Sequence, residues 1–354
     1  MLRKISFAAI AVLVFNTLNA QDSTKTLSFS GSVDGYYRYN FAGKANNYTS
    51  FTNSQSSFEL GMASLKADAT AMSGKVGATV DLGFGRRAEE FSYNDGELNA
   101  NKNGFLTLAA IKQAYITYAP SSKIKFTAGK FATHVGYELV DAPLNRNYSM
   151  SYMFTNGPFS HTGLKADVSL GGKSSFMIGV SNPTDYRTAP GMPKSVIAQF
   201  STATKDDKLK LYLNFAGGKQ NDTKKLVQGD LVATYALSSQ FSIGVNSTMQ
   251  AVQLKDSASN WNKSNWWGTA LYLNVDPVSW FGLTLRAEYI GDDDEYLGLK
   301  NVFAPTLSGN FKIDNLTIVP EFRLDNAGNS VFYKNETDTT KSTGSFILAA
   351  TYHF

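Results

Sequence analysis

The sequence predicts an all-β protein, a transmembrane antiparallel up-and-down β-barrel of about 16 strands, with 14 or 18 strands as alternatives. Three observations support this prediction: apolar and polar side chains alternate along most of the chain, tight turns alternate with long polar connections, and aromatic residues gather near the strand ends. The 354 residues include no cysteine, 13% aromatic and 18% charged residues, and the net charge is +4. This composition excludes a disulfide scaffold, a thiolate metal site and a disordered chain, and the charge does not indicate nucleic-acid binding.

The chain begins with a predicted export signal. Arg3 and Lys4 precede an apolar stretch over residues 5–15, and a short segment ends at the small residue Ala20. This order is typical of a secretory signal peptide, and a buried N-terminal helix is the alternative. We therefore expect residues 1–20 to be cleaved after Ala20 and residues 21–354 to form a single domain. No later stretch approaches ~18 consecutive apolar residues, which leaves a secreted protein or a membrane barrel.

Strands are predicted where side chains alternate with a period of two. Leu209, Leu211, Leu213 and Phe215 share one face, and the polar residues between them share the other, as in a strand that lies between two solvents. In chain order, the same pattern recurs over residues 76–84, 124–128, 176–180, 241–249, 281–289, 303–311, 316–324 and 346–354. Weaker strands begin near Leu27, Leu65, Ala110, Thr162, Val196, Val227 and Trp267.

The connections between strands fall into two classes. The tight turns cover residues 73–74, 120–122, 171–173, 205–207, 237–239, 276–278 and 314–315. The longer polar connections cover residues 40–57, 86–107, 131–158, 182–194, 217–225, 251–264, 291–300 and 326–343. Short periplasmic turns and long extracellular loops are typical of bacterial outer-membrane barrels, whereas a soluble sandwich has no reason to sort its loops by length.

Aromatic residues on the predicted outward face form two groups, as expected where rings lie at the two membrane interfaces. Those near the short turns are Phe29, Tyr118, Phe126, Phe176, Tyr235, Phe241, Phe281, Tyr352 and Phe354. Those near the long connections are Tyr37, Phe84, Phe215, Trp267, Tyr289 and Phe303. We therefore expect the chain to lie in the bacterial outer membrane, in contact with lipids and glycolipid. The alternation also places Lys112 and Lys130 outward, where they either extend to the headgroup region or hold glycolipid phosphates.

The inward face collects charged residues of both signs, and these are the lumen-lining candidates. They are Asp34, Arg38, Lys66, Asp68, Asp81, Lys125, Lys165, Asp167, Lys210, Asp230, Arg286, Glu288, Glu321, Arg323 and Asp325. So many ionisable groups require either a water-filled lumen or one crowded by ion pairs. A barrel of about sixteen strands is wide enough for an aqueous channel. Because the two signs are nearly balanced, no preference for cations or anions is predicted.

The third long connection is the most distinctive segment. Residues 129–149 read Gly-Lys-Phe-Ala-Thr-His-Val-Gly-Tyr-Glu-Leu-Val-Asp-Ala-Pro-Leu-Asn-Arg-Asn-Tyr-Ser, and residues 156–163 read Asn-Gly-Pro-Phe-Ser-His-Thr-Gly. Here the chain resembles the β-barrel porin family described as OmpL-like, and the similarity runs from about Gly31 to Phe354. The resemblance implies a porin-type outer-membrane barrel with no enzymatic activity and no cofactor.

By analogy with porins, the resemblance also implies that the third connection folds inward and narrows the pore. The pore-constriction candidates are Glu138, Asp141 and Arg146, facing Arg86 and Arg87 from the preceding connection. The alternative is that these are ordinary solvated loop charges. The C-terminal Tyr352-His353-Phe354 is similar to the aromatic signal that barrel-assembly machinery recognises, so Phe354 is the candidate assembly signal.

No catalytic or metal-binding residues are predicted. The chain has three histidines, His134, His161 and His353, and none is expected on the lipid face where an outer-membrane phospholipase works. Two functions therefore remain open. One is a channel for passive diffusion of small hydrophilic solutes, and the other is a non-transporting barrel that serves as a scaffold or partner-binding subunit, supported by Trp261, Trp266 and Trp267 near one rim. The sequence leaves open whether the barrels form a homo-oligomer.

Overall fold

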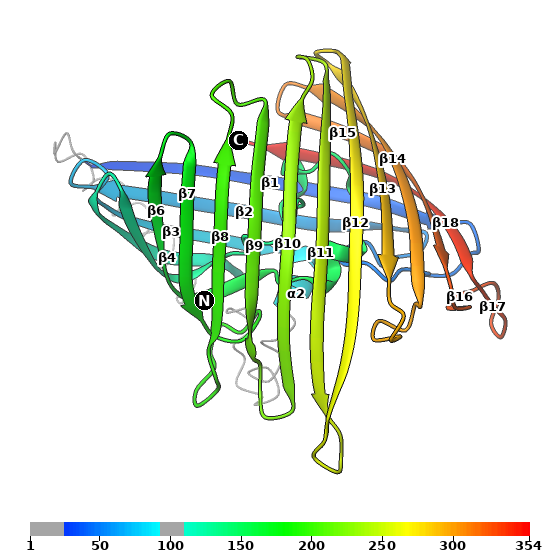
Figure 1. Cartoon of the computed structure of the whole chain (residues 1–354). Helices are drawn as coiled ribbons and strands as arrows, with labels where there is room; N and C mark the ends of the chain where they lie inside the picture. Colours follow the sequence, from blue (N-terminus) through cyan, green and yellow to red (C-terminus); the bar gives the residue numbers. More distant parts are fainter. Residues whose placement is uncertain (1–24, 93–109) are drawn as a thin grey trace, which may run out of the picture.

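The computed structural model describes residues 25–92 and 110–354, which form a closed antiparallel barrel of sixteen strands (Figure 1). The barrel strands are β1 (Thr26–Asn40), β2 (Ser57–Ala71), β3 (Val76–Phe84), β4 (Ile111–Ser121), β5 (Ile124–Ala132), β6 (Ser160–Gly171), β7 (Ser174–Ser181), β8 (Ser195–Ala203), β9 (Leu209–Lys219), β10 (Lys224–Ala236), β11 (Phe241–Lys255), β12 (Trp261–Val278), β13 (Phe281–Gly291), β14 (Asn301–Ile313), β15 (Leu316–Ala327) and β18 (Ser342–His353). Each strand pairs with its neighbour in the chain, and β18 closes the barrel on β1. The predicted fold class and the count of about sixteen are confirmed. The predicted signal peptide, residues 1–20, lies outside the described residues.

The alternating pattern arises because each strand has one face toward lipid and one toward the interior of the barrel, the bore. On β13, Leu285 and Tyr289 are exposed on the outside, whereas Arg286 and Glu288 are fully buried inside. Tyr289 pairs directly with Phe303 of β14, and Phe281 pairs with Phe311 at the other end. Aromatic rings therefore line both outer rims, as the sequence predicted.

The connections follow the predicted sorting, with two exceptions. The predicted long connections over residues 217–225 and 251–264 are mostly strand, because β9 continues to Lys219, β10 begins at Lys224, β11 continues to Lys255 and β12 begins at Trp261. Polar side chains end the hydrophobic alternation there, but backbone pairing does not require apolar side chains and continues beyond it. Figure 1 shows these two hairpins extending at the lower end of the barrel. The last long connection carries a small hairpin, β16 (Phe332–Tyr333) with β17 (Thr339–Thr340).

The outward placement of Lys112 and Lys130 was wrong, since both side chains are buried inside. Asp81 pairs with Gln113 while Leu82 pairs with Ile111, so Lys112 is the extra residue of a β-bulge, and a bulge redirects the side chain. Lys130 follows Gly129, whose φ of +131° breaks the regular alternation before it. The Lys130 ammonium lies 4.6 Å from the Phe91 ring and donates to the Ile111 carbonyl at 2.9 Å.

Within the described residues, three short helices lie in the connections: α2 (Arg86–Phe91), the 3-10 turn η3 (Ala142–Leu144) and α4 (Tyr152–Asn156). In the described part of the chain, no helix is both long and apolar enough to cross a bilayer. The third long connection, residues 133–159, contains η3 and α4 and lies inside the barrel, and we call it the inserted loop. The apolar core of the molecule therefore lies within the bore, where Met153 of this loop packs with Trp266, Ile290 and Val302 of the wall.

Candidate functional site

The inserted loop and the inner wall of the barrel form the candidate site. The loop lies in the bore because it carries apolar side chains, and burying these side chains away from water is favourable. Met150, Phe154 and Phe159 are buried in a second cluster, against Phe51 of the first long connection and Phe91 of α2. The position of the loop is then fixed by polar contacts, which differ between the two halves of the wall.

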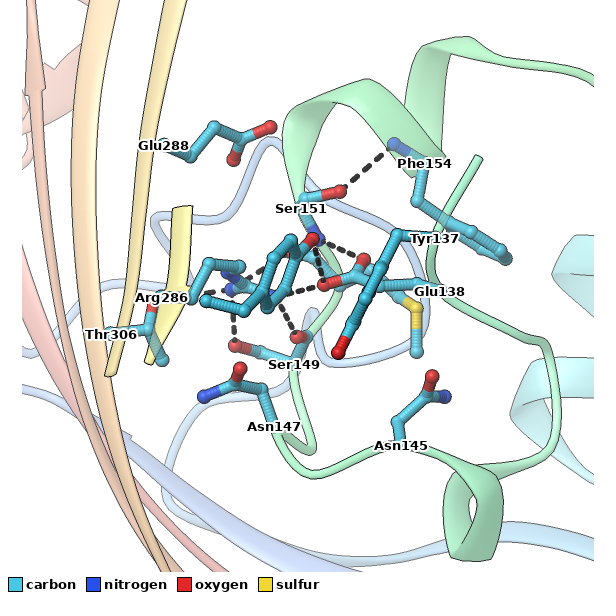
Figure 2. A network of polar contacts seen from close by, with 12 residues as sticks. Tyr137, Glu138, Asn145, Asn147, Ser149, Ser151, Phe154, Arg286, Glu288 and Thr306 are labelled. Atoms are coloured by element: carbon cyan, nitrogen blue, oxygen red, sulfur yellow. Dashed lines mark hydrogen bonds and ion pairs between the residues drawn. The ribbon is translucent and has the colours of Figure 1, made fainter. Parts of the chain in front are cut away.

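Glu138 and Arg286 form the central ion pair between loop and wall (Figure 2). The Arg286 guanidinium of β13 lies 2.5 Å from the Glu138 carboxylate and also donates to the Ser149 carbonyl at 2.7 Å. The Glu138 carboxylate accepts further bonds from the Tyr272 hydroxyl at 3.2 Å and the Ser151 backbone N–H at 2.7 Å. Both partners are buried, and the hydrogen bonds to Ser149, Ser151 and Tyr272 help to offset the loss of hydration of the two charges.

Two wall carboxylates bind the backbone of the loop. Glu321 of β15 accepts the N–H groups of Tyr148 and Ser149 at 2.7 and 3.0 Å. Glu288 of β13 accepts the N–H groups of Tyr152 and Met153 at 2.9 and 2.8 Å, at the start of α4. The N–H groups of Tyr152 and Met153 have no partner within the short helix, because they belong to its first turn. The carboxylate of Glu288 therefore accepts hydrogen bonds that the helix itself leaves open. Ser151 caps the same helix by accepting the Phe154 N–H at 3.0 Å.

Arg146 anchors the loop nearer the short turns. Its guanidinium forms a bidentate ion pair with the Asp276 carboxylate, at 2.9 and 3.0 Å, and donates to the Thr284 hydroxyl at 2.7 Å. On β15, Arg323 donates to the Met150 carbonyl at 2.6 Å and forms an ion pair with Asp325 at 2.8 Å. The wall from β12 to β15 thus uses its charges to hold the loop.

The remaining constriction candidates also contact wall charges. Asp141 is paired with Lys112 at 2.5 Å, and Lys112 also lies 3.2 Å from Asp81. Arg87 is fully buried, lies 3.6 Å from Asp34 and donates to the Tyr148 carbonyl at 3.0 Å. Arg86 is partly exposed and pairs with Glu59 at 3.1 Å. Each predicted candidate therefore has its own partner. Among the described residues, Glu138, Asp141 and Arg146 form no ion pair with Arg86 or Arg87.

The loop meets the other half of the wall at Asp230 of β10. This carboxylate accepts the Gly136 N–H at 3.0 Å and the side-chain amides of Asn214 and Asn246 at 2.7 Å each. Gly136 has a φ of +93°, which favours glycine, and Val135 beside it is buried. Here the loop is held by hydrogen bonds from neutral groups rather than by an ion pair.

The lumen-lining candidates divide by depth. The buried ones are Asp34, Arg38, Asp81, Asp230, Arg286, Glu288, Glu321, Arg323 and Asp325. Those nearer the short turns are partly or fully exposed: Lys66, Asp68, Lys125, Lys165, Asp167 and Lys210. Among these, Lys66 pairs with Asp68 at 3.0 Å and Lys165 pairs with Asp167 at 3.3 Å. The lumen charges thus divide into a group that holds loops and an exposed group near the short turns.

Two cavities lie beside the loop, both along the wall from β8 to β11. The outer cavity, toward the long connections, has a volume of about 340 Å³ and is lined by residues that include Asn156, Gln220, Gln228 and Gln250. The inner cavity, toward the short turns, has a volume of about 320 Å³ and a lining that includes Gln199, Tyr212, Asn214 and Thr234. Apart from His134, each lining includes one acidic or basic residue, Lys224 in the outer cavity and Glu138 in the inner cavity.

His134 also lines the inner cavity, and its ring stays neutral at pH 7. Burial lowers the pKa of His134 to about 4, well below its ordinary value. Its ring nitrogen lies 3.0 Å from the Phe215 carbonyl. The cavities are therefore lined mainly by amides, hydroxyls and aromatic rings. Within residues 25–92 and 110–354, no group of three acidic or histidine side chains is arranged to hold a metal ion.

Sequence reasoning missed several residues of this site. Asp276 was assigned to a tight turn, although it anchors Arg146. The amides of β8 to β11 were not among the predicted site residues, because they carry no charge. The sequence does indicate that they face inward, since Asn214 alternates with Leu213 and Phe215. The stacking of Tyr137 on Tyr272, with ring centroids 4.0 Å apart, left no signal in the sequence because it joins distant segments.

Comparison with known proteins identifies relatives of this arrangement. The model of the family described as "Putative beta-barrel porin-2, OmpL-like" matches residues 26–354. No curated protein matches significantly by sequence.

Among solved structures, the outer membrane channel DcaP of Acinetobacter baumannii superposes with a TM-score of 0.65 at 10% identity, covering 94% of this chain and 99% of that chain. An anion-selective porin from Comamonas acidovorans gives 0.62 at 11% identity, covering 93% of this chain and 100% of that one. OmpT, an outer membrane protein of Vibrio cholerae, gives 0.59 at 10%, covering 95% and 99%. At these identities the likeness shows the fold alone.

Proposed function

The chain belongs to the OmpL-like β-barrel porin family, and from this membership we propose that it is a bacterial outer-membrane channel for passive diffusion of small hydrophilic solutes. The single observation that carries the proposal is the pair of cavities beside the inserted loop, both along β8 to β11 and both with amides and hydroxyls in their linings. Family and fold indicate a channel rather than an enzyme. Cleavage after Ala20, contact with outer-membrane lipids, insertion by barrel-assembly machinery and homo-oligomer formation are parts of the same proposal.

The two cavities adjoin along the wall. On β9, Ala216 lines the outer cavity and Asn214, the next inward residue, lines the inner cavity. On β10, Gln228 and Val232 line the outer and inner cavities, with Asp230 between them. The proposed route therefore follows the side of the wall where few charged residues line the cavities, and it is narrowest where Asp230 holds the loop. An amide-lined route suits polar solutes, because each amide both donates and accepts hydrogen bonds.

The test is to shorten the inserted loop. Removing residues 137–148 takes away the segment between the Gly136 contact and the Glu321 contact, so single-channel conductance in a planar bilayer should rise. Removal of the exposed tip 334–338 is the control, because it lies outside the bore and should leave conductance unchanged. Unchanged conductance in a folded 137–148 deletion would show that this loop does not limit the pore.

A second candidate function is a non-transporting barrel that serves as a scaffold or partner-binding subunit. The observation that favours it is the dense contact between loop and wall, where Trp266, Arg286 and Glu288 are fully buried. Conductance separates the two functions. A conducting wild-type barrel supports the channel, whereas a folded wild-type protein that conducts nothing supports the scaffold.

A further inference from the structure

Lysines form a row on the outside of the barrel, near its long-connection end. In the register of the sheet, Lys219 of β9 pairs with Lys225 of β10, and Lys225 pairs with Gln253 of β11. Gln253 in turn pairs with Lys263 of β12. Directly paired residues of antiparallel strands point to the same face, so these four side chains lie side by side. We call Lys219, Lys225 and Lys263, with Gln253 between the last two, the lysine row.

The lysine row faces the lipid side. Val227, Met249 and Trp267 are exposed on the outer face, and each is separated from the row residue of its strand by an even number of positions. The intervening residues Leu226 and Trp266 are buried in the bore. Because strand side chains alternate between faces, the row cannot line the channel.

The depth of the row follows from its distance to Trp267, one of the outward aromatic residues near the long connections, which together we call the girdle. Trp267 pairs with Met249, four residues from the level of the row. At ~3.3 Å per residue and a strand tilt of ~40°, the row lies about 10 Å above that girdle. The girdle marks the edge of the hydrocarbon, so the lysines lie at headgroup depth. In porin-type barrels the long connections are extracellular, so this is the outer leaflet.

Two of the three lysines in the row lack a counter-charge among the described residues. Like charges directly opposite each other destabilise a strand pair, and Lys219 and Lys225 are so placed. Lys219 pairs with exposed Asp222 at 2.7 Å. In the described part of the chain, no acidic group forms an ion pair with Lys225 or Lys263. The Trp261 ring lies 4.3 Å from the Lys225 ammonium and 5.9 Å from that of Lys255, which adds another cation at the rim.

We propose that the lysine row and Trp261 bind the phosphorylated sugar headgroup of an outer-leaflet glycolipid. Lys225 and Lys263 are two strands apart, about 9.6 Å at the usual strand spacing, which suits a headgroup with two separated phosphates. The acyl chains of such a lipid would cover Val227 and Met249 below the row. A membrane lipid fits better than a free anion, because the site continues into the lipid-facing surface. This proposal depends on the outer-membrane location and does not depend on transport.

The test measures binding of bisphosphorylated lipid A to the full-length protein in a non-ionic detergent, by native mass spectrometry. Replacing Lys225→Gln together with Lys263→Gln should weaken binding ~25-fold, since each lysine near an anionic surface contributes roughly fivefold. The matched control, Lys205→Gln with Lys208→Gln, removes two exposed lysines at a short turn and should leave the affinity unchanged. Inorganic phosphate should not compete at concentrations that leave the lipid bound.

A second variant tests the site without removing charge. Gln253→Lys fills the gap in the row and should tighten lipid binding roughly fivefold. Equal affinity of the row variant and the wild type, or equal losses in the row variant and the short-turn control, would overturn the proposal. Competition by inorganic phosphate would identify a free-anion site instead and would likewise overturn it.

Discussion

Arg286 shows how a single residue holds the inserted loop. Its guanidinium is fully buried and contacts Glu138, the Ser149 carbonyl and Thr306. Arg286→Met leaves the Glu138 carboxylate buried without a cation, which should reduce the free energy of unfolding by about 3–5 kcal/mol. Denaturant unfolding in detergent micelles measures this loss. Arg86→Met removes a partly exposed ion pair with Glu59 and should cost less than about 1 kcal/mol. Similar losses in the two variants would contradict the role of Arg286.

Neutralising two loop carboxylates should change ion selectivity. Glu138→Gln with Asp141→Asn leaves Arg286 and Lys112 without their acidic loop partners. Fixed charge inside a narrow pore attracts the opposite ion, most strongly at low ionic strength. The reversal potential in a salt gradient should therefore shift toward anions, while Asp222→Asn, on an exposed connection, should leave it unchanged. A shift toward cations, or none in a conducting variant, would show that these carboxylates do not face the permeating ions.

At the scale of elements, sequence pattern predicts strands well and side-chain direction less well. The predicted strand over residues 76–84 has the same bounds as β3, because its two faces meet different solvents throughout. The direction of Lys112 was missed because a bulge shifts the alternation by one residue, and composition does not reveal a bulge. Pairing alone extends β11 and β12, so their length was also underestimated.

The candidate site could be predicted only in part. Inward parity identified Arg286, Glu288 and Glu321 as lumen residues, but not their partners. Glu138 and Arg286 are 148 positions apart in the chain, and their contact depends on where the loop lies across the bore. The backbone N–H groups that Glu288 and Glu321 accept have no sequence signature, because every non-proline residue has one.

The lipid-facing side of the strands supports a depth test. Leu285 of β13 lies midway between Phe281 and Tyr289, one at each rim, and pairs with Leu307. Leu285→Lys should reduce folding stability by ~2–4 kcal/mol, whereas Tyr289→Lys, near an interface, should reduce it by only ~0–1 kcal/mol. Refolding into bilayers of defined thickness, followed by denaturant titration, provides both values. Equal costs at the two positions would place the bilayer elsewhere on the barrel.

Two parts of the wall hold the inserted loop in different ways. From β12 through β15 and onto β1, and at Lys112 of β4, charged side chains bind the loop. From β8 to β11, the inner wall presents amides and hydroxyls around Asp230, and both cavities lie there. Because the loop is packed and bonded against β12 to β15, the cavities along β8 to β11 do not disrupt its apolar contacts. This asymmetry explains why a barrel whose inward residues include many charges has two cavities lined mainly by neutral groups.

Closure of the barrel depends on the end of the chain. The backbone N–H and carbonyl of Phe354 bond to Gly31, both at 3.0 Å, and complete the seam between β1 and β18. The ring of Phe354 is exposed beside Gly31, where any Cβ would lie 2.6 Å from it. Phe354→Ser keeps the two backbone bonds and removes only the ring, whereas deleting Phe354 removes both features. If the ring is the assembly signal, both variants should lower outer-membrane levels and leave periplasmic aggregate or fragments, and Phe354→Tyr should not. Fractionation of cell envelopes with immunoblotting gives these levels. Normal insertion of Phe354→Ser would argue that the seam, and not the ring, makes the terminal residue necessary.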